Sequence, residues 1–168
     1  TTISSRAIDY AISSGESHRL PALYLESINE ARTAYEEYHD LYWIDIILDR
    51  RYLTHLRALA DEIGDDKLLT YTKKAIDYQN LITLVRAMNQ NRTKNFLNAV
   101  LSSSGSISKK EILDLAQQDF EMLIRFYSRT HLDKVVQELD VSNNELSTLH
   151  LEALIDQEKM FQMHEGKR

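Results

Sequence analysis

Glu36 and His39 are the pair of residues whose types and spacing come nearest to a metal site. They form a Glu-x-x-His pair, and a separation of three places both side chains on one face of a helix. Helical di-iron enzymes need two such pairs and two further glutamates, and the sequence has no second pair. We therefore expect no metal site and disfavour a helical enzyme of the di-iron or terpenoid type. Stoichiometric iron or zinc in the purified protein would reverse that expectation.

Hydroxyl side chains gather at residues 102–106, where serines surround Gly105. This run lacks the G-x-S-x-G turn that presents a nucleophilic serine, and the sequence contains neither a P-loop nor a GxGxxG motif. The chain has no cysteine, which excludes thiolate zinc sites and cysteine nucleophiles. We interpret residues 102–106 as a solvated loop, and we predict no catalytic, cofactor-binding or metal-binding residues.

The net charge of −6 argues against general nucleic-acid binding. The charge is unevenly distributed, because residues 66–110 hold 2 acidic and 8 basic residues while the segments on both sides are acidic. One hypothesis is that a basic middle packs between acidic flanks. The other is that this middle presents a basic face to an acidic partner, and the sequence leaves both open.

Helices must position these residues, because 4 glycines and 1 proline are too few turn-formers for a β-rich fold of this size. Pro21 suits the first turn of a helix, and apolar residues recur at helical spacing from Leu25 to Tyr42. A break near residues 39–45 separates this helix from a second one, which ends at Gly64. We predict an all-α multi-helix bundle without a significant sheet.

Five further helices are predicted after Gly64. The first begins with Asp66 as its N-cap and runs to about Met88. The others are residues 93–101, a helix through Tyr127 opened by a Ser108–Glu111 capping box, residues 132–139, and a last helix opened by a Ser142–Glu145 capping box. The last helix decays into a polar tail at residues 165–168. No apolar run approaches the roughly 18 residues that a membrane span needs.

The first of these five helices is apolar on most of its faces, which predicts a buried, central position. Only a narrow strip around Thr72, Gln79 and Arg86 is polar, yet Asp77 and Asn80 point into the apolar sector. Buried polar groups need partners, or they cost about 1–3 kcal/mol each. Either this pair hydrogen-bonds a neighbouring helix or its exposed end and fixes the helix register, or it makes a polar contact with another protein of an assembly.

Residues 75–87 resemble the "I-D-x-x-N-[LI]-x-x-x-[LI]-R-A" helix of the C subunit of bacterial and archaeal V/A-type rotary ATPases, a family that includes the d subunit of eukaryotic vacuolar ATPases. Residues 49–56 are similar to the family's "L-D-x-x-Y-[FL]-x-x-L" helix. Residues 104–107 stand where the family usually has "P-G-G-x-[IL]", although the proline and one glycine are missing. The resemblance covers most of residues 21–140. The architectural residues that it implies are Asp49, Tyr52, Asp77, Asn80, Arg86 and Gly105.

The resemblance implies a role rather than a reaction. Family members contain three related helical repeats around a pseudo-threefold axis. Residues 1–20 would then end the preceding repeat or form a linker, residues 21–140 would form the middle repeat, and residues 141–168 would begin the next one. The implied function is that of a non-catalytic central-stalk adaptor, which couples the shaft driven by ATP hydrolysis to the ion-translocating rotor ring of the membrane. The implied partners are the shaft subunits of D and F type and the ring, on the cytoplasmic face.

Because the chain begins at Thr1 rather than Met, we expect it to be a piece of a longer protein. Removing the rest of such a funnel would expose apolar surface, so we also expect some self-association. The alternative function is that of an unrelated helical scaffold or regulatory module, which binds another helix through an apolar face. Two further Asp-x-x-Asn helices in the full-length gene would favour the rotary ATPase family.

Overall fold

The computed structural model describes residues 22–38, 41–142 and 144–166. The described residues form eight α-helices, and extended pairing among them is limited to one antiparallel bridge between Ser142 and Glu145. In chain order the helices are α2 (Ala22–Tyr38), α3 (Leu41–Ile63), α4 (Asp66–Asn89), α5 (Lys94–Val100), α6 (Lys109–Leu115), α7 (Phe120–Tyr127), α8 (Asp133–Val136) and α9 (Thr148–Gly166). The prediction of an all-α fold is confirmed for this part of the chain.

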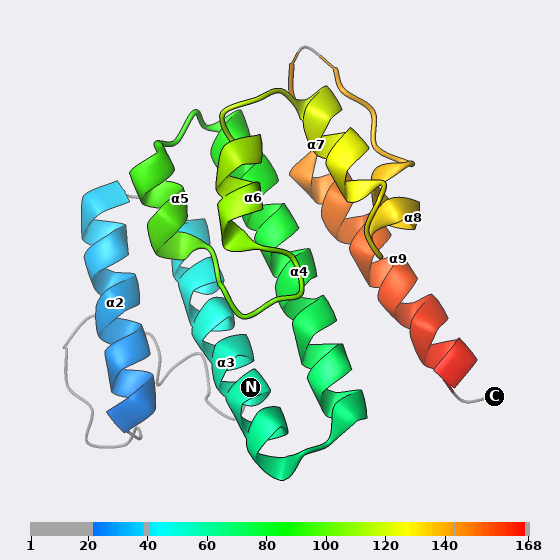
Figure 1. The fold of residues 1–168 in the computed structure, drawn as a ribbon. Coiled ribbons are helices and arrows are strands. Elements are labelled where there is room, and N and C mark those ends of the chain that lie inside the picture. Colours follow the sequence, from blue (N-terminus) through cyan, green and yellow to red (C-terminus); the bar gives the residue numbers. More distant parts are fainter. Residues whose placement is uncertain (1–21, 39–40, 143, 167–168) are drawn as a thin grey trace.

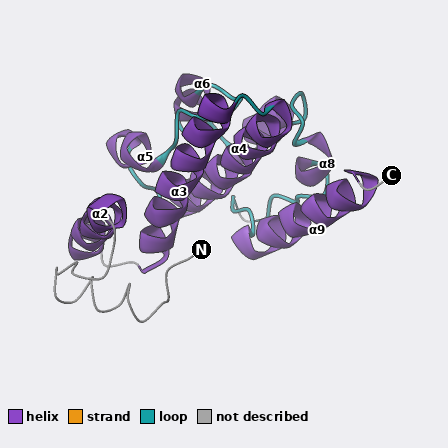
Figure 2. Cartoon of the chain, turned by 90° about the horizontal axis from the view of Figure 1, so that it is seen from below, coloured by secondary structure: helices purple, strands orange, loops and turns teal. Residues whose placement is uncertain are grey.

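The long helices α3 and α4 form an antiparallel hairpin around which the other helices are arranged (Figure 1). Helix α2 packs along α3. Helix α5 packs against both α3 and α4, and α6 packs against α5. Figure 1 draws α5 and α6 in front of the hairpin. Helix α9 packs against α4 and α8, and the view from below places it on the far side of α4 from α2 (Figure 2). Helix α4 therefore contacts neighbours on several sides.

The turn between α3 and α4 is built as the sequence predicts, with a shift of one residue. Gly64 has φ +77°, a conformation that glycine adopts without a steric penalty, and it ends α3. The N-cap of α4 is Asp65 rather than Asp66, because the Asp65 carboxylate accepts the N–H groups two and three residues further on, at 3.0 and 3.1 Å. Asp66 lies in the first helical turn, where its charge suits the helix dipole.

The central position of α4 is confirmed by the burial of its side chains. Those that are buried are Thr72, Ile76, Asp77, Tyr78, Asn80, Leu81, Ile82, Thr83, Leu84, Val85 and Ala87. Thr72 was expected on a polar strip but is fully buried. Its hydroxyl donates to the carbonyl of Leu69 at 2.9 Å, and this bond within the helix satisfies it away from water.

The single helix expected from Ser108 to Tyr127 is two helices, α6 and α7. The Asp119 carboxylate accepts the N–H of Met122 at 2.9 Å and starts α7 anew. The apolar spacing continues across this break, which is why periodicity alone missed it. Ser108 does precede α6 as its N-cap, but its side chain makes no capping hydrogen bond.

The C-terminal helices also differ from the prediction. Ser142 and Glu145 exchange two backbone hydrogen bonds, at 3.1 and 2.9 Å, instead of forming a capping box, so α9 begins only at Thr148. The helix expected over residues 132–139 shrinks to the single turn α8. Helix α9 extends to Gly166, so part of the expected polar tail is helical.

The predicted break near residues 39–45 agrees with the end of α2 at Tyr38 and the start of α3 at Leu41; residues 39–40 lie outside the described part. None of the described helices combines the length and apolarity required to cross a membrane.

Candidate functional site

The two buried polar residues of α4 hold the loop at residues 102–107, which we call the docked loop. The Asn80 side chain accepts the N–H of Ser102 at 3.0 Å and donates to the carbonyl of the same residue at 2.9 Å. Both backbone groups of Ser102 are therefore satisfied by one amide. Asn80 is 2% exposed, so the prediction that it is buried is confirmed.

Asp77 is the centre of a larger set of hydrogen bonds. Its Oδ1 accepts the N–H groups of Ser106 at 2.9 Å and Ile107 at 3.2 Å. Its Oδ2 accepts the hydroxyl of Ser106 and the Nε2–H of His131, the latter at 2.8 Å. The carboxylate is fully buried. Hydrogen bonds to a charged acceptor are roughly twice as strong as neutral ones, so Asp77 fixes the docked loop and the segment of His131 to α4.

Gly105 passes so close to Asp77 that it has no room for a side chain. A Cβ at this position would overlap Oδ1 of Asp77 and lie 3.1 Å from Cγ2 of Ile76. The requirement for glycine is therefore steric. Gly105, Asp77 and Asn80, which the family resemblance singled out, lie together in one cluster.

Three cationic side chains donate hydrogen bonds to backbone carbonyls of the docked loop and of α5, the helix before it. Arg57 donates to the carbonyl of Ser104 at 2.7 Å, Lys109 donates to that of Asn98 at 2.6 Å, and Arg50 donates to that of Ala99. Asn98 and Ala99 belong to the last turn of α5, where cations suit the helix dipole. Burial, together with the charge of Arg50, lowers the pKa of Lys109. This Lys109 contact lies within residues 66–110, so it does not decide between the two hypotheses for the basic middle.

Asp77, His131 and Ser106 have the residue types of a hydrolase triad but not its arrangement. In a triad the histidine lies between the serine and the carboxylate. Here the Ser106 hydroxyl and the His131 ring both donate to Oδ2 of Asp77, so the serine has no base. The expected solvated loop over residues 102–106 is solvated only in part, because Ser103 and Ser106 are exposed whereas Ser102 is 6% exposed.

Arg86 forms a second cluster, which joins three helices. Its guanidinium lies over the ring of Tyr42 on α3, with Cζ 3.2 Å from the ring centroid. On α9 it reaches Thr148 Oγ1 at 3.4 Å and Glu152 Oε1 at 4.0 Å. The Tyr42 hydroxyl donates to the same Glu152 oxygen at 3.1 Å. Burial raises the pKa of Tyr42, so this hydroxyl keeps its proton.

Asn89, at the end of α4, is a positioning residue that sequence reasoning missed. Its amide donates to the carbonyl of Leu146 at 2.7 Å and accepts the N–H of that residue at 3.3 Å. Asn80 makes the same pair of bonds with Ser102. The signal available in the sequence was a second asparagine on the same apolar helix, nine residues later.

Asp49 and Tyr52 are exposed side chains of α3, and Asp49 lines a furrow together with Tyr42 and Glu152 of the second cluster. Tyr52 is 45% exposed, and Asp49 is also exposed. Desolvation of its carboxyl and the nearby charge of Asp45 raise the pKa of Asp49, while Lys159 opposes the shift. The six residues that the resemblance groups together therefore occupy three places in the fold.

The Glu36–His39 pair does not form a describable site. Glu36 is exposed and lies 3.6 Å from the Arg32 guanidinium, and His39 falls outside the described residues. In the described ranges, no group of three or more histidine, aspartate or glutamate side chains is placed to hold a metal ion.

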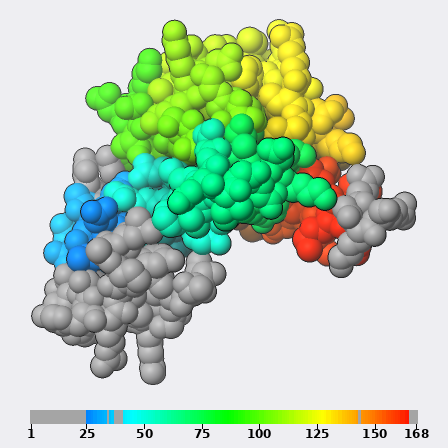
Figure 3. Space-filling model, turned by 60° about the horizontal axis from the view of Figure 1, so that its bottom comes forward, coloured from blue at the N-terminus to red at the C-terminus, as the bar shows by residue number. Residues whose placement is uncertain are grey.

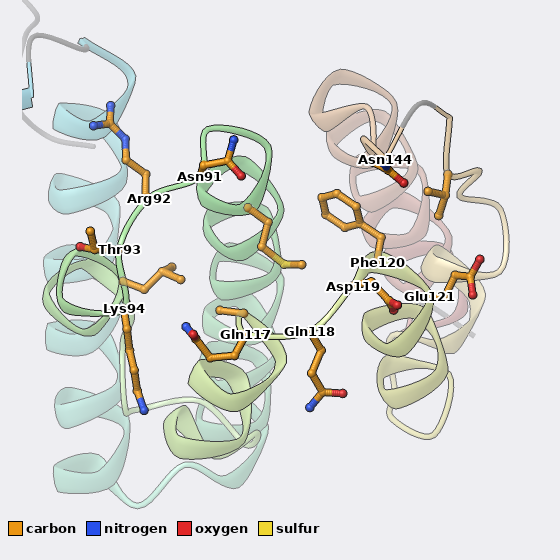
Figure 4. Close-up of a pocket in the computed structure, with 14 residues that line it drawn as sticks. Asn91, Arg92, Thr93, Lys94, Gln117, Gln118, Asp119, Phe120, Glu121 and Asn144 are labelled. Atoms are coloured by element: carbon orange, nitrogen blue, oxygen red, sulfur yellow. The ribbon is translucent and has the colours of Figure 1, made fainter.

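A cleft of about 550 Å³ opens beyond the C-terminal end of α4, between the starts of α5 and α7 (Figure 4). Thr93 and Asp119, on its two sides, are the capping residues of those helices. Figure 4 shows the amides of Gln117 and Gln118 between them. Helix caps and amides thus line the cleft together with apolar and charged side chains, and these lining residues present no nucleophile held by a base.

The described residues form an all-α fold in which buried polar side chains of one central helix hold the neighbouring loops. The chain belongs to the ATP synthase (C/AC39) subunit family, whose model matches residues 1–168. It is 31% identical over 146 residues to the C subunit of the V-type sodium ATPase of Enterococcus hirae. The alignment covers 87% of this chain and 44% of that relative, so the chain spans less than half of the relative's length. No solved structure matches. The resemblance is confirmed, and the alternative of an unrelated scaffold is wrong.

Proposed function

We propose that this chain is part of a non-catalytic central-stalk adaptor, which couples the shaft of a V/A-type ATPase to the ion-translocating rotor ring. The observation that carries this proposal is the family match over residues 1–168. The partners are the shaft subunits of D and F type and the ring, and the adaptor lies on the cytoplasmic face of the membrane.

The internal use of the polar residues supports an adaptor. Asp77 ties the docked loop and His131 to α4, and Arg86 ties α3 and α9 to the same helix. An element that transmits torque needs a densely packed interior, because dense packing has low compressibility and transmits strain.

We also propose that the chain contains one complete repeat of the family's pseudo-threefold funnel. Residues 21–140 form that repeat, residues 1–20 end the preceding repeat or link to it, and residues 141–168 begin the next. Helix α9, which packs on α4 and α8, is then the first helix of the following repeat.

Reconstituting the ATPase with and without the full-length parent of this chain tests the function. With the parent present, we expect ATP hydrolysis to drive ion transport into vesicles, and immobilised parent to retain the shaft subunits. Without it, hydrolysis by the catalytic head continues but transport stops. The E. hirae relative is named a sodium ATPase, so ²²Na⁺ uptake and a proton-sensitive dye are recorded in parallel. Undiminished transport without the parent, or ATP hydrolysis by the parent alone, would contradict the proposal.

A further inference from the structure

A surface furrow runs between α3 and α9, with α4 beneath it. Its volume is about 330 Å³, and its lining includes Asp45 and Asp49 on α3, Ile82 on α4, and Asp156 and Lys159 on α9. In Figure 3, α9 (red) lies beside the α3–α4 hairpin (cyan to green) and the surface steps inward between them. A water molecule occupies about 30 Å³ in the liquid, so the furrow has room for a few side chains.

The rim of the furrow is acidic. Glu152 is partly neutralised by Arg86, which lies 4.0 Å from it. The other three acidic residues that line the furrow are Asp45, Asp49 and Asp156, and Lys159 is the one basic residue in the lining. Its ammonium lies 5.6 Å from the ring centroid of Tyr78. Burial first, and the nearby charge of Asp45 second, raise the pKa of Asp49. An added cation would favour its ionised form.

The exposed apolar side chains near the furrow lie on α9 rather than on the furrow floor. Ile46, Ile82 and Ile155 line the floor but are already buried, at 1%, 9% and 1% exposed. Helical spacing places Leu149 and Met163 on the same side of α9 as Asp156, one at each end. Leu149 is 78% and Met163 64% exposed, which is unusual for large apolar side chains.

We propose that the furrow is the docking site for a cationic amphipathic α-helix of another protein, with its apolar side chains packing on Leu149 and Met163 of α9 and its lysines or arginines meeting Asp45, Asp49 and Asp156. Two flanking helices form a groove that a third helix can fill. The charge of the rim selects a basic partner over an acidic one. This inference is argued from the surface of this chain and does not rest on the proposed function.

The occupant is a separate protein rather than a second copy of this chain. The net charge of this chain is −6. A second copy would therefore on balance bring more negative charge to an acidic rim, and like charges in contact are unfavourable.

The test uses an 18-residue synthetic helix with leucines on one face and lysines on the other, titrated into the ¹⁵N-labelled full chain. We expect amide shifts concentrated in residues 45–52 and 149–163. The triple variant Asp45→Asn, Asp49→Asn, Asp156→Asn should bind about tenfold more weakly, because three rim ion pairs are lost. The matched control Glu62→Gln, Asp114→Asn, Asp140→Asn makes the same change in net charge at exposed positions outside the furrow, and it should bind within twofold of the unaltered chain.

Circular dichroism of both variants establishes that they are folded. Equal weakening by the two triple variants would overturn the proposal, because binding would then follow bulk charge. Equal binding of a peptide with glutamates in place of the lysines would overturn it as well. So would sedimentation showing that the unaltered chain dimerises through the furrow, with dimerisation abolished by the furrow variant alone.

Discussion

Asp77 accepts four hydrogen bonds while fully buried, and Gly105 packs against it without space for a Cβ. The sequence indicated both residues, through an apolar helix interrupted by an acid and through a family motif. It did not indicate their relation, because the Asp77 partners lie 29, 30 and 54 residues away. Periodicity reports which side chains are enclosed but not which distant backbone groups they meet.

Gly105→Ala should destabilise the chain by about 2–3 kcal/mol, since the new methyl overlaps a carboxylate that four donors hold in place. Urea unfolding measures the effect. Ser103→Ala, at an exposed position of the same loop, serves as the control and should change the free energy of unfolding by less than about 0.5 kcal/mol. Equal effects of the two substitutions would contradict the prediction, because they would show that the loop can move away from Asp77 without a loss of stability.

Asp49→Asn should raise stability at neutral pH, by no more than about 0.5 kcal/mol because the site is exposed. The folded-state pKa lies above the ordinary value of 3.8, so the folded chain binds the proton more tightly than the unfolded chain. The ionised carboxyl is therefore unfavourable above that folded-state pKa, and the penalty disappears below pH 3.8, where both states are protonated. Thermal unfolding from about pH 3 to 8 should show the advantage of Asn growing with pH. An advantage that shrinks with rising pH would contradict the sign.

Helix α4 organises its neighbours through side chains spaced along its length: Asp77 and Asn80 hold the docked loop, Arg86 reaches α3 and α9, and Asn89 clamps Leu146. The helices themselves were largely predictable, since long apolar stripes and a glycine stop mark α3 and α4. Their boundaries were less so. Asp119 starts a helix in mid-pattern, and Ser142 makes a backbone bridge where a capping box was expected. In both cases the apolar spacing fits either conformation, and local hydrogen bonds determine which one forms.

Asp77→Ala should lower the free energy of unfolding by about 3 kcal/mol and Asn80→Ala by about 2 kcal/mol. Each substitution leaves hydrogen-bonding groups of the docked loop without a partner, and the Asp77 carboxylate accepts more hydrogen bonds than the Asn80 amide makes. Thr83→Val is the control. It removes a buried hydroxyl that bonds only within α4, to the carbonyl of Gln79, and should cost under about 1 kcal/mol. Thermal and urea unfolding measure all three. If Asp77→Ala and Asn80→Ala left stability unchanged, the architectural role of this pair would be wrong.

Arg86→Lys should increase the hydrogen-exchange rate of α9 more than that of α5. Lysine keeps the charge but loses the planar group that stacks on Tyr42, so the cluster should weaken by about 1 kcal/mol. Hydrogen exchange followed by mass spectrometry should show faster exchange in residues 148–160, with residues 94–100 unchanged. Arg129→Lys, at an exposed arginine, is the control. Uniformly faster exchange would mean that Arg86 stabilises the whole fold rather than the α9 contact.

Helix α9 lies at the edge of the described molecule and packs on α4 and α8 (Figure 1). Several of its large apolar side chains are exposed, among them Leu149, Met160 and Met163. Such a surface is typical of an interface. The proposed arrangement of repeats around an axis rests on the family resemblance alone, because a single repeat would carry no internal copy against which periodicity can be tested.

The chain should self-associate weakly through Met160 and Phe161 of α9, which are 61% and 47% exposed and do not line the furrow. We expect this at concentrations of roughly 0.1–1 mM, the range of a contact worth about 4–5 kcal/mol. Met160→Ser with Phe161→Ser should shift the chain towards monomer, while Met122→Ser, on α7, should not. Because the contact is apolar, added salt should leave it unchanged. Light scattering with a concentration series measures this, and a strict monomer throughout would rule the association out.

The long reach of Asp77 also bears on how the chain folds. The α3–α4 hairpin joins neighbours in sequence, whereas the Asp77 carboxylate closes loops of 29 and 54 residues. Closing such loops costs conformational entropy before the hydrogen bonds form, so we expect these bonds to form late in folding. Interactions absent from the transition state slow unfolding without speeding folding. We therefore expect the buried carboxylate to set the lifetime of the native state more than the rate at which the chain reaches it.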